Sequence, residues 1–247
     1  FITSILRTGV IIPLTHTLLG HTVNITILDN ATLANTSLDC ISALGKLTVH
    51  QLTSPEQVLA HSQNAEVLIT NKVVINRDTM AQLTSLKLIC VSATGTNNVD
   101  LNAAKDLGIA VTNVAGYSTP SVVQHTFSLI TNLLGNTHRY QADCQQGAWQ
   151  KSDMFCRLNY SFNDIQGKTL AIIGGGTLGN AVSKVAEAFG AHVIVAERKG
   201  AECRQGRTPF ETAIKTADII SVHCPLNDET RDLITLNELK MMKPTAL

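Results

Sequence analysis

Residues 174–179 read Gly-Gly-Gly-Thr-Leu-Gly, and their surroundings decide the fold. An apolar run at 169–173 precedes them, and an alanine-rich amphipathic stretch at 180–189 follows, which predicts a strand, a glycine turn and a helix in succession. In such a turn the first glycine permits the bend, the second admits a pyrophosphate, and the third lets helix and strand pack closely. The helix amides then face the phosphates. The residues predicted to bind a dinucleotide here are Gly174, Gly176, Thr177, Leu178 and Gly179.

An acid follows the next predicted strand. Residues 192–196 form the next predicted strand, and Glu197 comes directly after them, 18 residues beyond Gly179, where such folds place an acid on the adenosine ribose. A 2′-phosphate about 4 Å from that carboxylate would be repelled by roughly 4 kcal/mol per charge pair at an effective dielectric near 20. Glu197 therefore favours NAD over NADP. Arg198 and Lys199 leave open a cationic contact to a 2′-phosphate, and Arg198 is included among the predicted cofactor residues.

Composition and charge narrow the function classes. The chain has 247 residues, of which 44% are apolar and 15% charged, as in globular proteins. Nineteen basic residues balance nineteen acidic ones, and no Lys/Arg cluster appears, so a nucleic acid is not expected as a partner. No apolar run is long enough to span a bilayer, so no membrane association is expected.

The six cysteines are scattered, without a Cys-x-x-Cys pair or a metal-like Cys/His cluster. We interpret them as reduced thiols of a cytoplasmic protein that binds no metal.

The alternation of short β-rich runs and helical stretches predicts α/β architecture with two doubly wound parallel-sheet domains. The first, a flavodoxin-like substrate domain over 23–118, has predicted strands at 24–28, 47–49, 67–70, 88–91 and 110–112, with helices at 55–61 and 101–107. The second, a Rossmann NAD-binding domain over 119–247, has predicted strands at 169–173, 192–196 and 219–223 and helices at 121–134, 180–189, 209–216 and 236–241.

The sequence also leads to an expectation about each end of the chain. A complete dinucleotide fold has two strand-helix-strand halves, and residues 244–247 end where another strand is due, so we expect a C-terminally truncated domain. Residues 1–22 precede the first predicted strand and are interpreted as an extension of doubtful origin, with the native start near Val23.

Five further strings are more specific than the glycines. They are Thr-Gly-Thr-Asn-Asn-Val-Asp at 94–100, Asn-Val-Ala-Gly-Tyr-Ser-Thr-Pro-Ser-Val-Val-Gln-His-Thr at 113–126, Ser-Asp-Met-Phe-Cys at 152–156, Glu-Arg-Lys-Gly at 197–200 and His-Cys-Pro-Leu at 223–226. With these strings the chain resembles, from about residue 23 to 247, the D-isomer-specific 2-hydroxyacid dehydrogenases, most closely their glycerate dehydrogenase or hydroxypyruvate reductase branch.

The resemblance implies binding residues in both domains. On the substrate side, the backbone amides of Ala93, Thr94 and Gly95 hold the substrate carboxylate, Lys72 places a cation near it, and Ser118 occupies a substrate-side position. A solvated loop lysine is the alternative for Lys72. The implied cofactor residues are Thr126 at the nicotinamide end and His223, Cys224, Pro225 and Thr230 beside the adenosine ribose.

The chemistry of the family needs an arginine that polarises the 2-oxo acid, a histidine that donates a proton, and an acid that keeps the histidine protonated. By the resemblance all three fall after Leu247, so no catalytic residue is assigned within the chain, and we expect the chain alone to be inactive. We interpret His125 and His223 as hydrogen-bonded structural or cofactor-border residues.

The function implied for the full-length parent is NAD-dependent interconversion of a small 2-oxo acid and a D-2-hydroxy acid, with hydroxypyruvate and D-glycerate as the preferred pair. The family also implies a homodimer built through the nucleotide domains. The alternative is an NAD-sensing regulatory protein on the same scaffold, which binds the dinucleotide without turning over a substrate.

Overall fold

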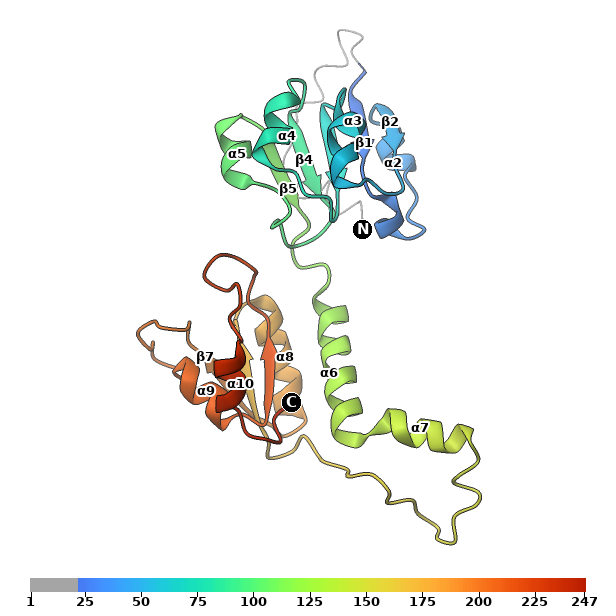
Figure 1. The fold of residues 1–247 in the computed structure, drawn as a ribbon, viewed down its shortest axis with the longest axis vertical. Coiled ribbons are helices and arrows are strands. Elements are labelled where there is room, and N and C mark those ends of the chain that lie inside the picture. The colour runs from blue at the N-terminus through green and yellow to red at the C-terminus, as the bar shows by residue number, and fades with distance from the viewer. Residues whose placement is uncertain (1–21) are drawn as a thin grey trace. The chain divides into compact units, whose positions relative to one another are not determined.

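A computed structural model describes residues 22–247, which divide into two compact units, one ending at Tyr117 and one spanning Ser118–Leu247 (Figure 1). Apart from Thr22, the predicted extension over 1–22 lies outside the described residues.

The first unit is built on a five-stranded parallel sheet with the strand order β2-β1-β3-β4-β5, and it confirms the predicted flavodoxin-like class. Its strands are β1 (Asn24–Ile27), β2 (Lys46–Val49), β3 (Val67–Thr70), β4 (Leu88–Val91) and β5 (Ala110–Asn113). Successive side chains of a strand face opposite sides of a sheet. Accordingly, Leu68 and Ile89 belong to one core cluster and Ile69 and Leu88 to the other, so both faces of the sheet are covered.

Six helical segments connect these strands: η2 (Asn30–Leu33), α2 (Asp39–Ser42), η3 (Pro55–Gln57), α3 (Val58–Ser62), α4 (Arg77–Gln82) and α5 (Leu101–Asp106). The helix predicted at 55–61 is divided into a 3₁₀ turn, opened by the capping box of Ser54 and Gln57, and α3. Asp100 caps α5 by accepting a 2.8 Å hydrogen bond from the Ala103 amide, as expected of an acid at that position.

The second unit holds a three-stranded parallel sheet with the order β7-β6-β8. Its strands are β6 (Thr169–Ile173), β7 (His192–Ala196) and β8 (Ile219–Val222), so two predicted strands match exactly and the third ends one residue early. Thr208 adds an isolated parallel bridge to Ala196, on the outer edge of β7. The neighbours of β6 thus lie on opposite sides, which makes the β6/β8 junction the place where the strand order reverses.

Helices cover both faces of this sheet. They are α6 (Thr119–Gly135), α7 (Thr137–Gln145), α8 (Thr177–Ala188), α9 (Phe210–Thr216) and α10 (Leu236–Met241). Leu170 and Ile172 of β6 pack in one cluster with α6 and α8, whereas Ala171 and Ile173 pack in another with α9 and α10. Figure 1 shows α8 on one side of this sheet and α9 and α10 on the other. The alternation along β6 fixes the strand register, because a slip of one residue would exchange the two faces. No helix within residues 22–247 is long and apolar enough to cross a membrane.

Candidate functional site

The three motif glycines serve three different purposes. Gly174 has a φ of +100°, and a Cβ there would collide with the Cys224 amide nitrogen, so the turn and the end of β8 meet backbone to backbone. At Gly179 a Cβ would collide with the Gly174 carbonyl oxygen and lie 2.8 Å from Cγ2 of Ile172 in β6. At Gly176 a Cβ would meet no atom within 4 Å. Protein packing therefore explains the first and third glycines but not the second.

The open backbone at Gly176 coincides with the start of α8. Gly176 is the N-cap of this 12-residue helix, and no side chain caps its first turn. The first amides of a helix have no partner within the helix, and their partial positive charge attracts phosphate. Helix α8 begins at Thr177 rather than at the predicted 180, so Thr177, Leu178 and Gly179 form its first turn. An open approach beside uncapped amides fits the diphosphate of a dinucleotide.

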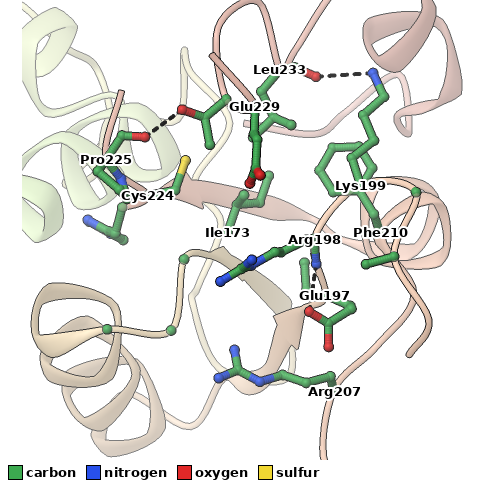
Figure 2. A pocket seen from close by; sticks show the side chains of 18 of the residues that line it. Ile173, Glu197, Arg198, Lys199, Arg207, Phe210, Cys224, Pro225, Glu229 and Leu233 are labelled. Atoms are coloured by element: carbon green, nitrogen blue, oxygen red, sulfur yellow. Dashed lines mark hydrogen bonds between the residues drawn. The ribbon is translucent and has the colours of Figure 1, made fainter. Parts of the chain in front are cut away.

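A cavity of about 630 Å³ lies at the carboxyl ends of β6, β7 and β8 (Figure 2). Its volume is within the range of about 300–1,000 Å³ typical of ligand pockets. The predicted residues that line it are Gly174, Gly176, Glu197, Arg198, His223, Cys224, Pro225 and Thr230. The structure thus brings together residues that lie more than 50 positions apart in the sequence. Ligands of open parallel sheets bind at this edge, where the strand order reverses.

Thr126 is not among the residues that line this cavity. It lies on α6, where its Oγ1 donates a 2.8 Å hydrogen bond to the Val122 carbonyl oxygen of the preceding turn.

Glu197 occupies the expected place after β7, but its carboxylate is already engaged. The side chain is only 2% exposed, and Arg204 donates to it through Nε and Nη2, both at 2.7 Å. Backbone amides add bonds of 2.8 Å from Arg198 and 3.3 Å from Arg204. The Arg204 guanidinium, followed by the Arg198 amide, lowers the pKa of Glu197 to about 2, so the carboxylate is charged at neutral pH.

The other cations of this segment have separate positions. Lys199 donates a 2.6 Å hydrogen bond to Oε1 of Glu238 in α10 and lies 5.7 Å from the centre of the Phe210 ring. It thereby ties the residues after β7 to α10. The Arg207 guanidinium lies over the backbone of Gly175, because a Cβ at that glycine would collide with it.

The end of β8 forms the opposite wall of the cavity. The His223 amide donates a 2.7 Å hydrogen bond to the Ile173 carbonyl oxygen, and its Nε2 is 2.8 Å from Oγ of Ser221. Burial lowers the pKa of His223, which favours the neutral imidazole. Thr230 donates to the Pro225 carbonyl oxygen at 2.5 Å and accepts from the Asn227 amide at 2.9 Å, so its hydroxyl closes the loop on itself.

In the first unit, the turn that carries Lys72 is fixed by a buried acid that the sequence analysis missed. Asp29 follows β1 and is 3% exposed. Its carboxylate accepts hydrogen bonds from the backbone amides of Asn71, at 3.0 Å, and Lys72, at 2.6 Å. The Lys72 side chain is exposed. The sequence signal for such a clamp was an acid placed directly after an apolar strand.

The predicted carboxylate-binding loop follows β4. The Val114 amide donates to the Ala93 carbonyl oxygen at 3.0 Å, Thr94 Oγ1 donates to the Val114 carbonyl oxygen at 2.8 Å, and Asn113 Nδ2 donates to the Thr94 carbonyl oxygen at 2.7 Å. The carbonyl groups are thus engaged, whereas the amides of Thr94 and Gly95 find no acceptor among residues 22–247. Free amides held in a fixed loop suit an anionic carboxylate. Ser118 is the N-cap of α6 and makes no side-chain cap bond.

Fold and cavity together define an α/β protein with a nucleotide-binding second unit. Residues 127–247 match the family model described as D-isomer specific 2-hydroxyacid dehydrogenase, NAD binding domain. This part of the chain therefore belongs to the D-isomer specific 2-hydroxyacid dehydrogenase family, as its motifs predicted.

Two curated relatives and one solved structure are similar to this chain. A putative 2-hydroxyacid dehydrogenase of Haemophilus influenzae is 44% identical over 81% of the chain and 64% of the relative. A glycerate dehydrogenase of Methylorubrum extorquens is 39% identical over 78% of the chain and 61% of the relative. The structure of an acyclic imino acid reductase in complex with NADPH and D-Arg is 26% identical, with a TM-score of 0.79 over 90% of the chain and 72% of that structure. The chain thus spans less than two thirds of the two curated relatives.

Proposed function

We propose that the protein to which this chain belongs is an oxidoreductase that interconverts a small 2-oxo acid and the corresponding D-2-hydroxy acid with a nicotinamide dinucleotide. The observation that carries this proposal is the open backbone at Gly176 beside the uncapped start of α8, within the cavity at the ends of β6, β7 and β8. Hydroxypyruvate and D-glycerate are the proposed substrate pair, supported by the similarity to the Methylorubrum glycerate dehydrogenase.

The proposed cofactor is NAD(H), which supplies or accepts the hydride when bound. The amides of Thr177 and Leu178 in the first turn of α8 would bind its diphosphate. Glu197 would lie at the adenosine ribose, with His223, Cys224 and Pro225 along the opposite wall of the cavity. Thr126 is proposed as the residue at the nicotinamide end.

The substrate-binding residues are proposed on the first unit and at Ser118, the first residue of the second unit. The free amides of Thr94 and Gly95 would hold the carboxylate of the 2-oxo acid, and Lys72 would supply a cation on a turn fixed by Asp29. Ser118 is the proposed residue next to the substrate. These groups bind and orient the acid but transfer no proton.

Reduction of a 2-oxo acid also consumes a proton at the carbonyl oxygen, and we assign this donor to no residue between 22 and 247. His223 is a poor candidate, because burial lowers its pKa and Ser221 lies at hydrogen-bond distance from its Nε2. We therefore propose that residues 1–247 alone have negligible turnover.

A homodimer is proposed from the exposed apolar side chains that follow α7. Trp149, Met154, Phe155, Leu158 and Phe162 are between 47% and 100% exposed, and Phe155 is completely so. Apolar side chains gathered on one exposed segment are typical of a protein interface. The mass of the protein in solution, measured by sedimentation, tests this: a monomer at micromolar concentration would contradict it.

Expression of the complete reading frame tests the proposed activity. We expect hydroxypyruvate to be reduced with concomitant loss of NADH absorbance, with a kcat/KM higher for hydroxypyruvate than for glyoxylate or pyruvate. Residues 1–247, assayed in parallel, control for turnover without a proton donor. Tight dinucleotide binding by the complete protein without turnover of any 2-oxo acid would overturn the proposed enzymatic function and favour an NAD-sensing regulator.

A further inference from the structure

The carboxylate of Glu197 has no position left for a ribose hydroxyl. A carboxylate offers about four lone-pair positions, and here each oxygen accepts two hydrogen bonds. Oε1 accepts from the Arg198 amide and Arg204 Nη2, and Oε2 accepts from the Arg204 amide and Nε. The hydroxyls of an unphosphorylated ribose must therefore displace Arg204 before Glu197 can bind them.

The same ion pair removes the repulsion that Glu197 would exert on a phosphate. The Arg204 guanidinium donates to both carboxylate oxygens of Glu197, so its positive charge balances the negative charge at the end of β7. Arg204 also lines the cavity, and its side chain is 63% exposed. A phosphate arriving there would meet the guanidinium rather than a bare carboxylate.

Two more guanidinium groups line the cavity without a carboxylate partner among residues 22–247. Arg198 crosses the middle of the cavity, and Arg207 lies on the same side as Glu197, beside the glycine turn (Figure 2). The remaining carboxylate that lines the cavity, Glu229, lies on the opposite wall near Leu233 (Figure 2). The positive charge is thus concentrated where the ribose would bind.

We propose that the ribose end of this cavity binds a 2′-phosphorylated adenosine, so that the protein accepts NADP(H) as well as NAD(H). Arg198 and Arg207 would contact the 2′-phosphate, since planar guanidinium groups suit phosphate oxygens. Glu197 is a positioning residue: it holds Arg204 and with it residues 198–207 in place. The proposal rests on the proposed nucleotide site and is independent of the proposed substrate.

Two adenosine nucleotides that differ only in the 2′-phosphate test this, using the complete protein and calorimetry at low ionic strength. We expect adenosine 2′,5′-bisphosphate to bind about fivefold more tightly than 5′-AMP, because charge-assisted hydrogen bonds are added. Equal or weaker binding of the bisphosphate would overturn the proposal and leave the nucleotide site intact. Failure of both ligands to bind would overturn the nucleotide site itself, and the proposal with it.

Substitutions at the two arginines identify which phosphate they contact. Arg198→Gln and Arg207→Gln should each weaken the bisphosphate about threefold to tenfold and leave 5′-AMP unchanged, whereas Lys215→Gln on α9 is the matched control for loss of a positive charge. An equal loss for both ligands would assign the arginines to the 5′-phosphate and contradict the proposed contact.

Glu197→Gln tells whether the carboxylate positions Arg204 or repels the 2′-phosphate, because the two roles change the affinity for the bisphosphate in opposite directions. If the carboxylate positions Arg204, the variant binds the bisphosphate more weakly than the native protein, since residues 198–207 lose their anchor. Tighter binding by this variant would show that Glu197 repels the 2′-phosphate and would overturn the proposal. Circular dichroism spectra and unfolding midpoints establish that each variant is folded.

Discussion

Asp29 and Glu197 are two buried acids that each follow a parallel strand, one in each unit, yet they are held in different ways. Asp29 accepts from the backbone amides of Asn71 and Lys72, so its donors belong to the backbone and not to a side chain that can swing away. Glu197 is held largely by the side chain of Arg204, which is 63% exposed. An acid bound by backbone fixes a turn permanently, whereas an acid bound by an exposed side chain has a partner that a ligand can replace. The first arrangement serves architecture and the second suits recognition.

Removal of the Asp29 carboxylate should produce the largest effect. Asp29→Ala leaves the amides of Asn71 and Lys72 without an acceptor in a partly buried turn, so we expect the free energy of unfolding to fall by about 2–3 kcal/mol. Urea denaturation measures this loss. Asp164→Ala, at an exposed acid, is the control and should change stability by less than about 0.5 kcal/mol. A loss for Asp29→Ala no larger than that control would refute the backbone clamp.

Gly176→Ala tests the amides at the start of α8, which no side chain caps, in contrast to the amides that Asp29 binds. A methyl group at Gly176 meets no protein atom within 4 Å, and its φ of −88° suits alanine, so stability should change by less than about 0.5 kcal/mol. Dinucleotide affinity should fall at least about tenfold, or about 1.4 kcal/mol, because the methyl group occupies the approach of the diphosphate. Calorimetry with NADH measures it. Native affinity in a folded variant would show that the diphosphate does not approach Gly176.

The smallest expected effect is the contribution of Glu197 to the pH dependence of stability. Its pKa is lowered from 4.5 to about 2 in the folded chain, so the ionised form is favoured by folding. The resulting stability is present above pH 4.5 and is lost as the pH falls from there toward 2. Arg204→Gln should lower the unfolding midpoint at pH 7 by a small amount, since Arg204 is 63% exposed to solvent, and the difference from the native protein should shrink as the pH falls from 4.5 toward 2. Identical pH profiles for the native protein and the variant would contradict this.

The sequence predicted the sheets well because buried parallel strands appear as short apolar runs bounded by turns. The strands at 67–70, 88–91, 169–173 and 192–196 match exactly. The start of α8 was placed three residues late, because Thr177, Leu178 and Gly179 continue the glycine motif in the sequence and carry no signal of their own for the start of a helix. Helices α2, α4 and α7 were missed, because α2 has only four residues and the other two are polar and lack a clear apolar period.

The candidate site was predicted in its positions but not in its contacts. A strand-turn-helix pattern fixes where Glu197 lies, because strand ends meet at one edge of the sheet. Its partner Arg204 lies seven residues further on, in a segment that bends at Gly200 and Gly206, with φ values of +75° and +77°. The path of such a segment depends on tertiary packing, here including the Lys199–Glu238 pair, and leaves no periodic signal in the sequence.

The Lys199–Glu238 pair has a practical consequence for protein engineering. Glu238 belongs to α10, 39 residues away, and it also accepts hydrogen bonds from the Thr235 amide and hydroxyl. A single acid therefore caps that helix and also binds Lys199 in the segment after β7. Grafting residues 197–208 alone into another scaffold would transfer the guanidinium groups without the ion pair to Glu238 that holds this segment in place. A transferable module would have to include α10 as well.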